Sequence, residues 1–151
     1  MSGTPVIGLE CKAAWCDLLL SGRKSVESRT YPLPEPCIGQ KIWLLASGGT
    51  ENVSSLGDTV APGCADAEIV GWVSFGSVMS YQSQAEWEQD ASRHCVSAHS
   101  PYAWKPGVTT EIYAWEVASR GRLAVPQPLP AMERLKRSLY MLQSEPEGRM
   151  S

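Results

Sequence analysis

A short apolar segment that ends at a glycine and is followed at once by charged residues constrains the fold of this chain more than any other feature. Residues 13–21 carry apolar side chains at three- and four-residue spacing, which predicts a helix. Gly22 suits the end of that helix, because glycine adopts the left-handed conformation without steric cost. Lys24, Glu27 and Arg29 follow on a segment expected to be extended. We therefore expect these three charges to lie close to the helix end.

The remaining pattern predicts alternating strands, loops and a second helix. The helical residues expected to face a sheet are Ala14, Trp15, Leu18 and Leu19. Strands are expected over 6–11, 24–30, 41–46, 68–79 and 110–118. Long loops are expected over 47–67 and 95–110. Ser83 and Glu86 form a capping-box pattern, which predicts a helix that ends near His94.

The C-terminal segment carries a further helical pattern. Pro130 suits a helix start, and the residues after it predict an amphipathic helix over 130–143 with one basic face. Its apolar residues are Met132, Leu135, Leu139 and Leu142. Its basic residues are Arg134, Lys136 and Arg137. We expect a single domain over 1–151, with a core of about 7–130 and this helix added to it.

Composition and charge narrow the class of protein. Hydrophobic residues make up 43% of the 151 residues and charged residues 19%, which is typical of a globular protein. The net charge of −3 argues against a protein that coats nucleic acid by bulk electrostatics, but it leaves room for a local basic cleft. No apolar run is long enough to span a bilayer and no signal peptide is evident, so we expect no membrane contact and an intracellular location, cytoplasmic or nuclear.

The cysteines predict neither a metal site nor a disulfide framework. Five is an odd number, and no C-x-x-C pair is present. Free thiols are expected at all five positions, and no metal or other cofactor is implied. The five are Cys11, Cys16, Cys37, Cys64 and Cys95.

The opening segment resembles the start of the ASCH domains, a branch of the PUA-like group of RNA-associated barrels. The matching positions are Leu9, Lys12, Trp15, Gly22, Lys24, Glu27 and Arg29. Later segments match in the same order, so that the resemblance covers about residues 7–130. It implies an α+β fold, a small PUA-like mixed β-barrel of five to six strands with flanking helices. It also implies a cleft between the first helix and the barrel.

The resemblance places the charged motif in that cleft and implies a nucleic-acid-binding module for single-stranded RNA or a nucleotide-like small molecule. Lys24 and Arg29 suit a phosphate or a carbonyl, and Glu27 could accept hydrogen bonds from a base edge. Lys12 follows a strand end and could reach the same cleft. We expect Lys12, Lys24 and Arg29 to converge on one anion, which makes the cleft basic on an acidic chain.

Aromatic residues complete the candidate binding site, each with a structural alternative. Trp15 could stack on a base or anchor the core, and core anchoring is the commoner role. Tyr102 and Trp104 lie in a proline-flanked loop and could stack on bases. The alternative is that the two rings only pack within their own loop. His94 and His99 receive no catalytic role, because a surface histidine at a helix end is the commoner explanation.

Two rival functions remain open. Some small bacterial ASCH proteins are amidohydrolases that act on N-acylated cytidine, and Lys24 matches their catalytic lysine. Glu27 stands where that group has a threonine nucleophile, and its expected pairing with Lys24 would keep the lysine protonated. Lys24 and Glu27 would be the catalytic residues of such an enzyme, or of a ribonuclease. The other rival is a protein-interaction adaptor in transcription coactivation, with the C-terminal helix as its contact surface.

Overall fold

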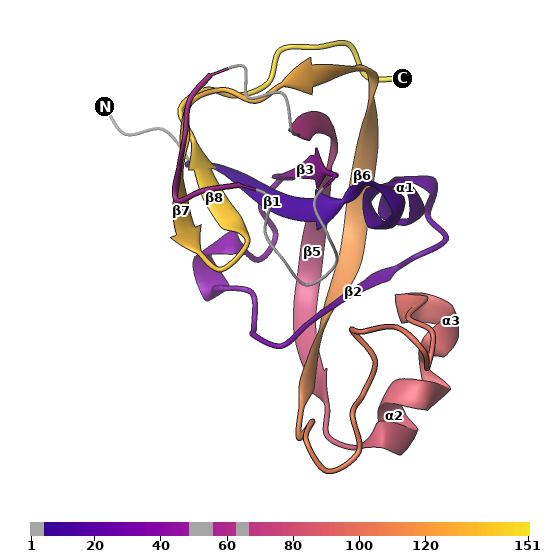
Figure 1. Cartoon of the computed structure of the whole chain (residues 1–151). Helices are drawn as coiled ribbons and strands as arrows, with labels where there is room; N and C mark the ends of the chain where they lie inside the picture. The colour runs from indigo at the N-terminus through magenta and orange to yellow at the C-terminus, as the bar shows by residue number, and fades with distance from the viewer. Residues whose placement is uncertain (1–4, 49–55, 63–66) are drawn as a thin grey trace.

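The computed structural model describes residues 5–48, 56–62 and 67–151, which form strands and short helical segments (Figure 1). The strands are β1 (Val6–Lys12), β2 (Val26–Arg29), β3 (Ile42–Ser47), β4 (Thr59–Val60), β5 (Ala67–Tyr81), β6 (Ile112–Pro128), β7 (Met132–Lys136) and β8 (Leu139–Leu142). The helices are α1 (Ala13–Ser21), the 3-10 helix η1 (Glu35–Cys37), α2 (Gln84–Gln89) and α3 (Ala91–His94).

The strands form one mixed sheet in the order β2-β6-β5-β3-β1-β8-β7-β4. β1 and β3 are parallel, and the other neighbours pair antiparallel. The predicted α+β class with a mixed sheet is confirmed. The predicted barrel of five to six strands was wrong in number, because the described sheet has eight strands. It is also not closed within the described residues, because the edge strands β2 and β4 do not pair with each other.

The C-terminal helix predicted over 130–143 was wrong, because this segment is the β7–β8 hairpin. The apolar spacing fits both structures: Met132 pairs with Leu142, and both are buried. Leu135, which a helix would place on its apolar face, is 47% exposed. β8 pairs with β1, so the hairpin completes the hydrogen bonds of a strand edge that a helix would leave open. A protein contact through an amphipathic helix here therefore has no basis.

Helix α1 and its glycine stop are confirmed. Gly22 has φ 85°, and its N–H donates to the Leu19 carbonyl. The predicted inward face was only partly right. Leu19 is buried as expected, but Ala14 is exposed, and Cys16 and Leu20 are buried in its place. The helix therefore packs on the sheet with a face that is rotated about its axis from the predicted one.

The second predicted helix is divided into α2 and α3. The Ser83 cap is confirmed, because the Ser83 hydroxyl accepts from the Glu86 N–H. The Glu86 carboxylate accepts from the N–H of Gln82, the residue before the cap, and not from that of Ser83. Asp90 separates the two helices. No described helix is long and apolar enough to cross a membrane. Most of the loop predicted over 47–67 lies outside the described residues, although Thr59–Val60 within it form β4.

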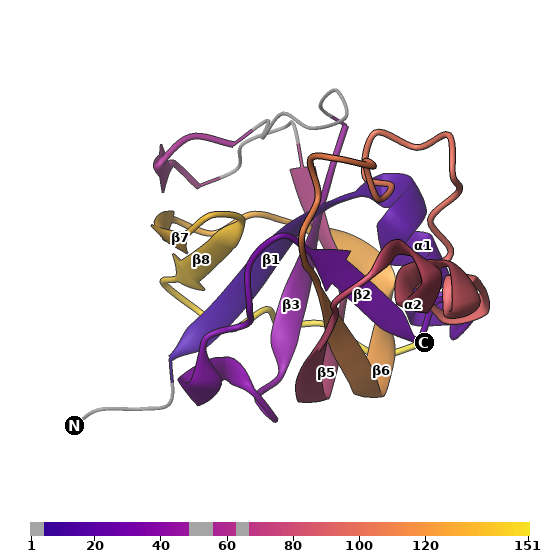
Figure 2. The same ribbon diagram turned by 90° about the horizontal axis from the view of Figure 1, so that it is seen from below.

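Part of the core lies away from the main sheet contacts and supports the site described below. It forms where α2, α3 and the segment 95–111 meet β2 and the adjoining ends of β5 and β6 (Figures 1 and 2). Its buried members are Val26, Tyr81, Trp87, Val96, Ala103, Ile112 and Ala114. Trp15, Tyr102 and Trp104 pack against this cluster and are partly buried.

Candidate functional site

A pocket of about 640 Å³ lies beside β1 and β2. Its walls come from the ends of β1 and β3, the start of α1, β2, the segment 96–112 and the turn of the β7–β8 hairpin. In Figures 1 and 2 the hairpin and the segment that follows α3 lie on opposite sides of β2. The pocket therefore has one end at the hairpin and the other at the 96–112 segment.

The structure brings six of the seven predicted binding residues to this pocket. The six are Lys12, Trp15, Lys24, Glu27, Arg29 and Tyr102. Trp104 is not among the lining residues, and it packs against the cluster beneath the pocket. Tyr102 therefore both lines the pocket and packs against this cluster, whereas Trp104 only packs against it. Ligand binding by these residues stays a prediction.

Lys24, Glu27 and Arg29 form a buried ion-pair cluster, called the triad below. The Glu27 carboxylate accepts from Arg29 Nε at 2.8 Å, and Arg29 Nη2 lies 2.7 Å from the same oxygen. Lys24 Nζ lies 3.6 Å from the other carboxylate oxygen. The side chains of Lys24 and Glu27 are only 1% and 6% exposed. The pairing predicted for Lys24 and Glu27 is therefore present.

The glycine stop and the neighbouring helix α3 set the position of Lys24. After Gly22 the backbone turns, and the Lys24 N–H donates to the Leu18 carbonyl at 3.0 Å. The Ser25 N–H donates to the Arg93 carbonyl at 3.0 Å, which ties this segment to α3. The Lys24 ammonium donates to the His94 carbonyl and lies 4.7 Å above the Trp15 ring. The lysine is thereby fixed at the pocket wall.

His94 is a buried residue whose backbone carbonyl accepts from the Lys24 ammonium. The prediction of a surface histidine was wrong, because His94 ends α3 with its ring fully buried. Nε2 lies 2.7 Å from the Trp87 carbonyl, and Nδ1 accepts from the Val96 N–H at 2.9 Å. This pairing fits a neutral ring with its proton on Nε2. Burial lowers the pKa of His94, which favours that neutral form. His99 is exposed.

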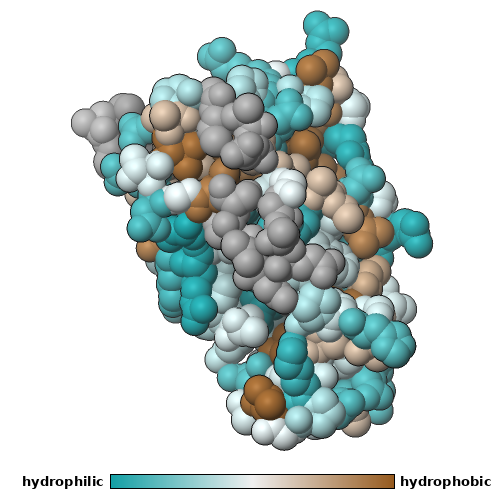
Figure 3. All heavy atoms as spheres, in the orientation of Figure 1, coloured by the Kyte–Doolittle hydropathy of each residue, from teal (hydrophilic) through white to brown (hydrophobic). Residues whose placement is uncertain are grey.

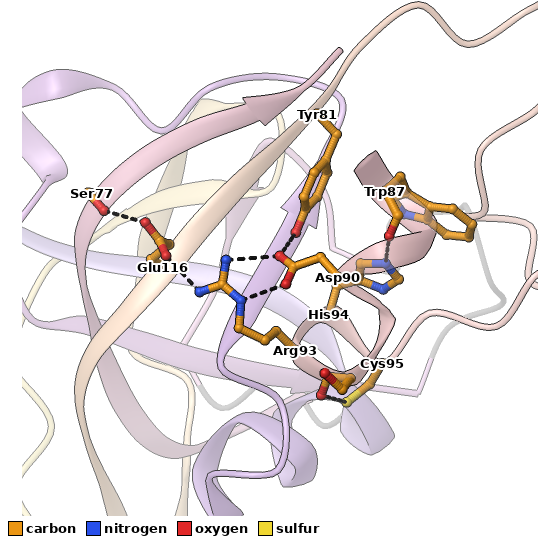
Figure 4. Close-up of polar contacts among 9 residues, drawn as sticks. Ser77, Tyr81, Trp87, Asp90, Arg93, His94, Cys95 and Glu116 are labelled. Atoms are coloured by element: carbon orange, nitrogen blue, oxygen red, sulfur yellow. Dashed lines mark hydrogen bonds and ion pairs between the residues drawn. The ribbon is translucent and has the colours of Figure 1, made fainter. Parts of the chain in front are cut away.

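A second set of ion pairs and hydrogen bonds, the α3 network, holds α3 to β5 and β6 (Figure 4). Arg93 donates to Asp90 and, at 2.7 Å, to Glu116 of β6. The Tyr81 hydroxyl donates to Asp90, and the Ser77 hydroxyl donates to Glu116 at 2.8 Å. Because His94 is the next residue after Arg93, the network also fixes the carbonyl that receives the Lys24 ammonium.

The pocket wall is cationic. Among the described residues it carries six lysine or arginine side chains and two glutamates, whereas the whole chain has a net charge of −3. The predicted basic character of the cleft is confirmed, and Lys12, Lys24 and Arg29 line the same pocket. Burial lowers the pKa of Arg29, but the Glu27 carboxylate, together with Tyr31 and Cys11, raises it, so that this pKa lies above its ordinary value. The triad thus combines two cationic side chains with one carboxylate.

Several lining residues were missed from the sequence. Arg134 and Arg137 were placed on the exposed face of a helix that does not exist, and Lys105 carried no motif. Tyr31 and Ser47 also line the pocket. The Tyr31 hydroxyl and the Ser47 hydroxyl are buried without a hydrogen-bond partner among the described residues. Only the pairing of strands could have brought these residues together.

The described residues contain no group of three or more histidine, cysteine, aspartate or glutamate side chains that could hold an ion. The four described cysteines are free thiols, as predicted, and Cys64 lies outside the described residues.

The fold is similar to that of a bacterial protein of known structure. An ASCH protein from Zymomonas mobilis matches with a TM-score of 0.57 and 16% sequence identity, over 93% of this chain and 90% of the other. A serine-to-alanine variant of that protein matches with a TM-score of 0.57 and 15% identity, over 95% and 92%. A tyrosine-to-phenylalanine variant gives 0.56 and 16%, over 92% and 91%. No family model matches the sequence, and no curated protein matches it.

Proposed function

We propose that this chain, which has the ASCH-domain fold, is a binding module for single-stranded RNA that holds a nucleotide of the strand in its pocket. The observation that carries the proposal is the charge of the pocket wall, six cationic side chains against two carboxylates on an acidic chain. A locally cationic pocket attracts phosphate-bearing ligands and steers their approach. A volume of about 640 Å³ is in the range of small-molecule sites.

Tyr102 is the side chain that we assign to base stacking. Its ring meets Trp15 edge to face, with centroids 6.2 Å apart, at the end of the pocket formed by the 96–112 segment. The Lys24 ammonium lies over the Trp15 ring, so the tyrosine ring is the better platform. The Tyr102 N–H donates to the Ser100 hydroxyl at 3.1 Å, which holds this part of the loop in place. Single-stranded RNA is commonly bound by stacking on such rings.

The triad supplies directional polar groups beside that ring. Glu27 uses one carboxylate oxygen for Arg29, while the other lies 3.6 Å from Lys24 and keeps capacity for further hydrogen bonds. A base amino group suits that oxygen as a donor, and a base carbonyl suits the cations beside it. Recognition of base edges by such groups, together with stacking, is the usual way in which proteins read unpaired RNA.

The direct test is binding of a fluorescently labelled single-stranded RNA hexamer of mixed sequence, followed by anisotropy. Tyr102→Ala should weaken binding by about 1–3 kcal/mol, which is the usual effect of removing one stacking ring. His99→Ala is the matched control, because His99 is exposed, precedes Tyr102 in the same loop and does not line the pocket. Absence of binding, or equal effects of the two variants, would contradict the proposal.

Hydrolysis of an N-acylated cytidine is the weaker candidate. A lysine that acts as a base needs a free lone pair. Lys24 instead donates to the His94 carbonyl and faces the Glu27 carboxylate. We therefore expect no acetate release from acetylated cytidine by the purified protein. Release that disappears in Lys24→Ala but persists in Glu27→Gln would favour the enzyme.

A further inference from the structure

We propose that the turn of the β7–β8 hairpin forms a phosphate subsite at the end of the pocket away from Tyr102, with Arg137 and the Tyr31 hydroxyl as its ligands. The inference rests on the proposed RNA function and adds to it the place of one phosphate of the bound strand. It follows from three observations: a fixed turn, an arginine that makes no ion pair among the described residues, and buried hydroxyls for which the same residues offer no hydrogen-bond partner.

Arg134 fixes the turn. Its Nε donates to the Asp58 carboxylate at 2.7 Å, and its Nη2 donates to the Leu56 carbonyl at 2.8 Å. Its Nη1 donates to the carbonyl of Arg137. All three nitrogens of this guanidinium are thus engaged within the protein. Arg134 positions the backbone of Arg137 and is not itself assigned to the ligand.

Arg137 is exposed at the tip of the turn and lines the pocket. Its backbone has φ 55°, a left-handed conformation that favours glycine. The arginine side chain is therefore present at a position where the backbone alone would favour glycine. Its guanidinium lies 5.3 Å above the Tyr31 ring, which directs it toward that residue. Among the described residues Arg137 makes no ion pair. Figure 3 shows hydrophilic side chains gathered over the hairpin.

Tyr31 and Ser47 provide the independent sign of a ligand. Tyr31 is 7% exposed and Ser47 is 2% exposed, and the hydroxyl of each lacks a hydrogen-bond partner among the described residues. A buried hydroxyl without a partner costs stability, since it has lost its water. Both residues line the pocket. A phosphate oxygen at this end would accept from the Tyr31 hydroxyl and pair with the Arg137 guanidinium.

The first arm of the test uses Tyr31→Phe, with unfolding by urea and binding of the RNA hexamer both measured. Because the hydroxyl has no hydrogen-bond partner in the described part of the chain, its removal should leave the unfolding midpoint unchanged or raise it. Binding should weaken by about tenfold, because a hydrogen bond to phosphate is lost. A lowered midpoint with unchanged affinity would overturn the inference, since the hydroxyl would then have a structural role.

The second arm uses Arg137→Gly, in which glycine suits the left-handed backbone and the hairpin should stay folded. We expect weaker RNA binding, and the slope of log affinity against log salt should be smaller in magnitude by about 0.7, the value for one phosphate contact to a single strand. Arg137→Lys should retain the slope. Lys136→Ala, the control on the same hairpin, should change it less, because Lys136 does not line the pocket.

The outcomes separate the two proposals. If the unmodified protein does not bind the hexamer, the proposed function fails and the subsite fails with it. If it binds, Tyr102→Ala weakens binding, and Arg137→Gly changes neither affinity nor slope, only the phosphate subsite is rejected. Equal losses of slope in Arg137→Gly and Lys136→Ala would also reject it, since they would indicate diffuse charge attraction.

Discussion

The triad and the α3 network both pair arginine with carboxylate, but they do so in two different environments. In the triad the Arg29 and Glu27 side chains are 17% and 6% exposed. In the network Arg93 and Glu116 are 39% and 32% exposed. The network connects α3 to β6 and so stabilises the fold. The triad instead lines a pocket. Burying charged groups costs free energy, so the triad is explained less well than the network by a purely structural role.

The largest effect should come from removing the shared carboxylate of the triad. Glu27→Ala leaves Lys24 and Arg29 buried without their anion, so the free energy of unfolding should fall by about 3 kcal/mol or more. Glu116→Ala, the matched change in the network, should cost at most about 1 kcal/mol, because water screens exposed pairs. Urea unfolding at neutral pH compares them. Equal losses of unfolding free energy in Glu27→Ala and Glu116→Ala would show that the two regions do not differ in this way.

The histidine between the two regions should make stability depend on pH. Burial lowers the pKa of folded His94, and the nearby Lys24 charge also lowers it, although the Trp87 carbonyl and Asp90 raise it. In the unfolded chain the pKa is about 6.5. His94 therefore contributes stability that is fully present above about pH 6.5 and is lost as pH falls through the lower folded pKa.

The measurement is the free energy of unfolding at pH 7.5 and pH 5.5. We expect a decrease over this range in the unmodified protein and in His99→Gln, whose altered side chain is exposed. His94→Gln should flatten the dependence, since glutamine does not titrate. A dependence that persists unchanged in His94→Gln would assign it to another group.

The smallest expected effect is the response to salt. At about 1 M salt the Debye length is about 3 Å, so the cost of Glu116→Ala should shrink toward zero. The cost of Glu27→Ala should persist, because buried pairs are screened much less. Repeating the unfolding experiment in 1 M sodium chloride gives both numbers. Loss of the Glu27 effect at high salt would place the triad in the same class as the network.

Local signals in the sequence predicted the helix stop and the charged segment well. Gly22 ends α1 in the left-handed conformation, and Lys24, Glu27 and Arg29 meet in one cluster. These outcomes depend on residues within one turn or strand, where spacing and glycine preference decide the structure.

The pairing of strands that are distant in the sequence could not be predicted from such local patterns. The spacing of Met132, Leu139 and Leu142 fits a helix as well as a hairpin, and the open edge of β1 decides between them. Tyr31 and Arg137 come together only because the hairpin folds back beside β1. His94 was misjudged for a similar reason, since Trp87 and Tyr81 cover its ring. Arg134 and Arg137 were missed as lining residues for this reason, since the hairpin carries both of them to the pocket.

The most direct test of the account follows the indole N–H signals of the tryptophans by NMR during titration with the RNA hexamer. Signals are assigned with single Trp→Phe variants. We predict that the Trp15 signal shifts, because this residue lines the pocket beside Tyr102. The signals of Trp43 and Trp72 should stay in place, since both pack in a separate cluster with Leu45. Shifts confined to Trp43 and Trp72, or no shift at Trp15 at saturation, would contradict the assignment of this pocket to RNA.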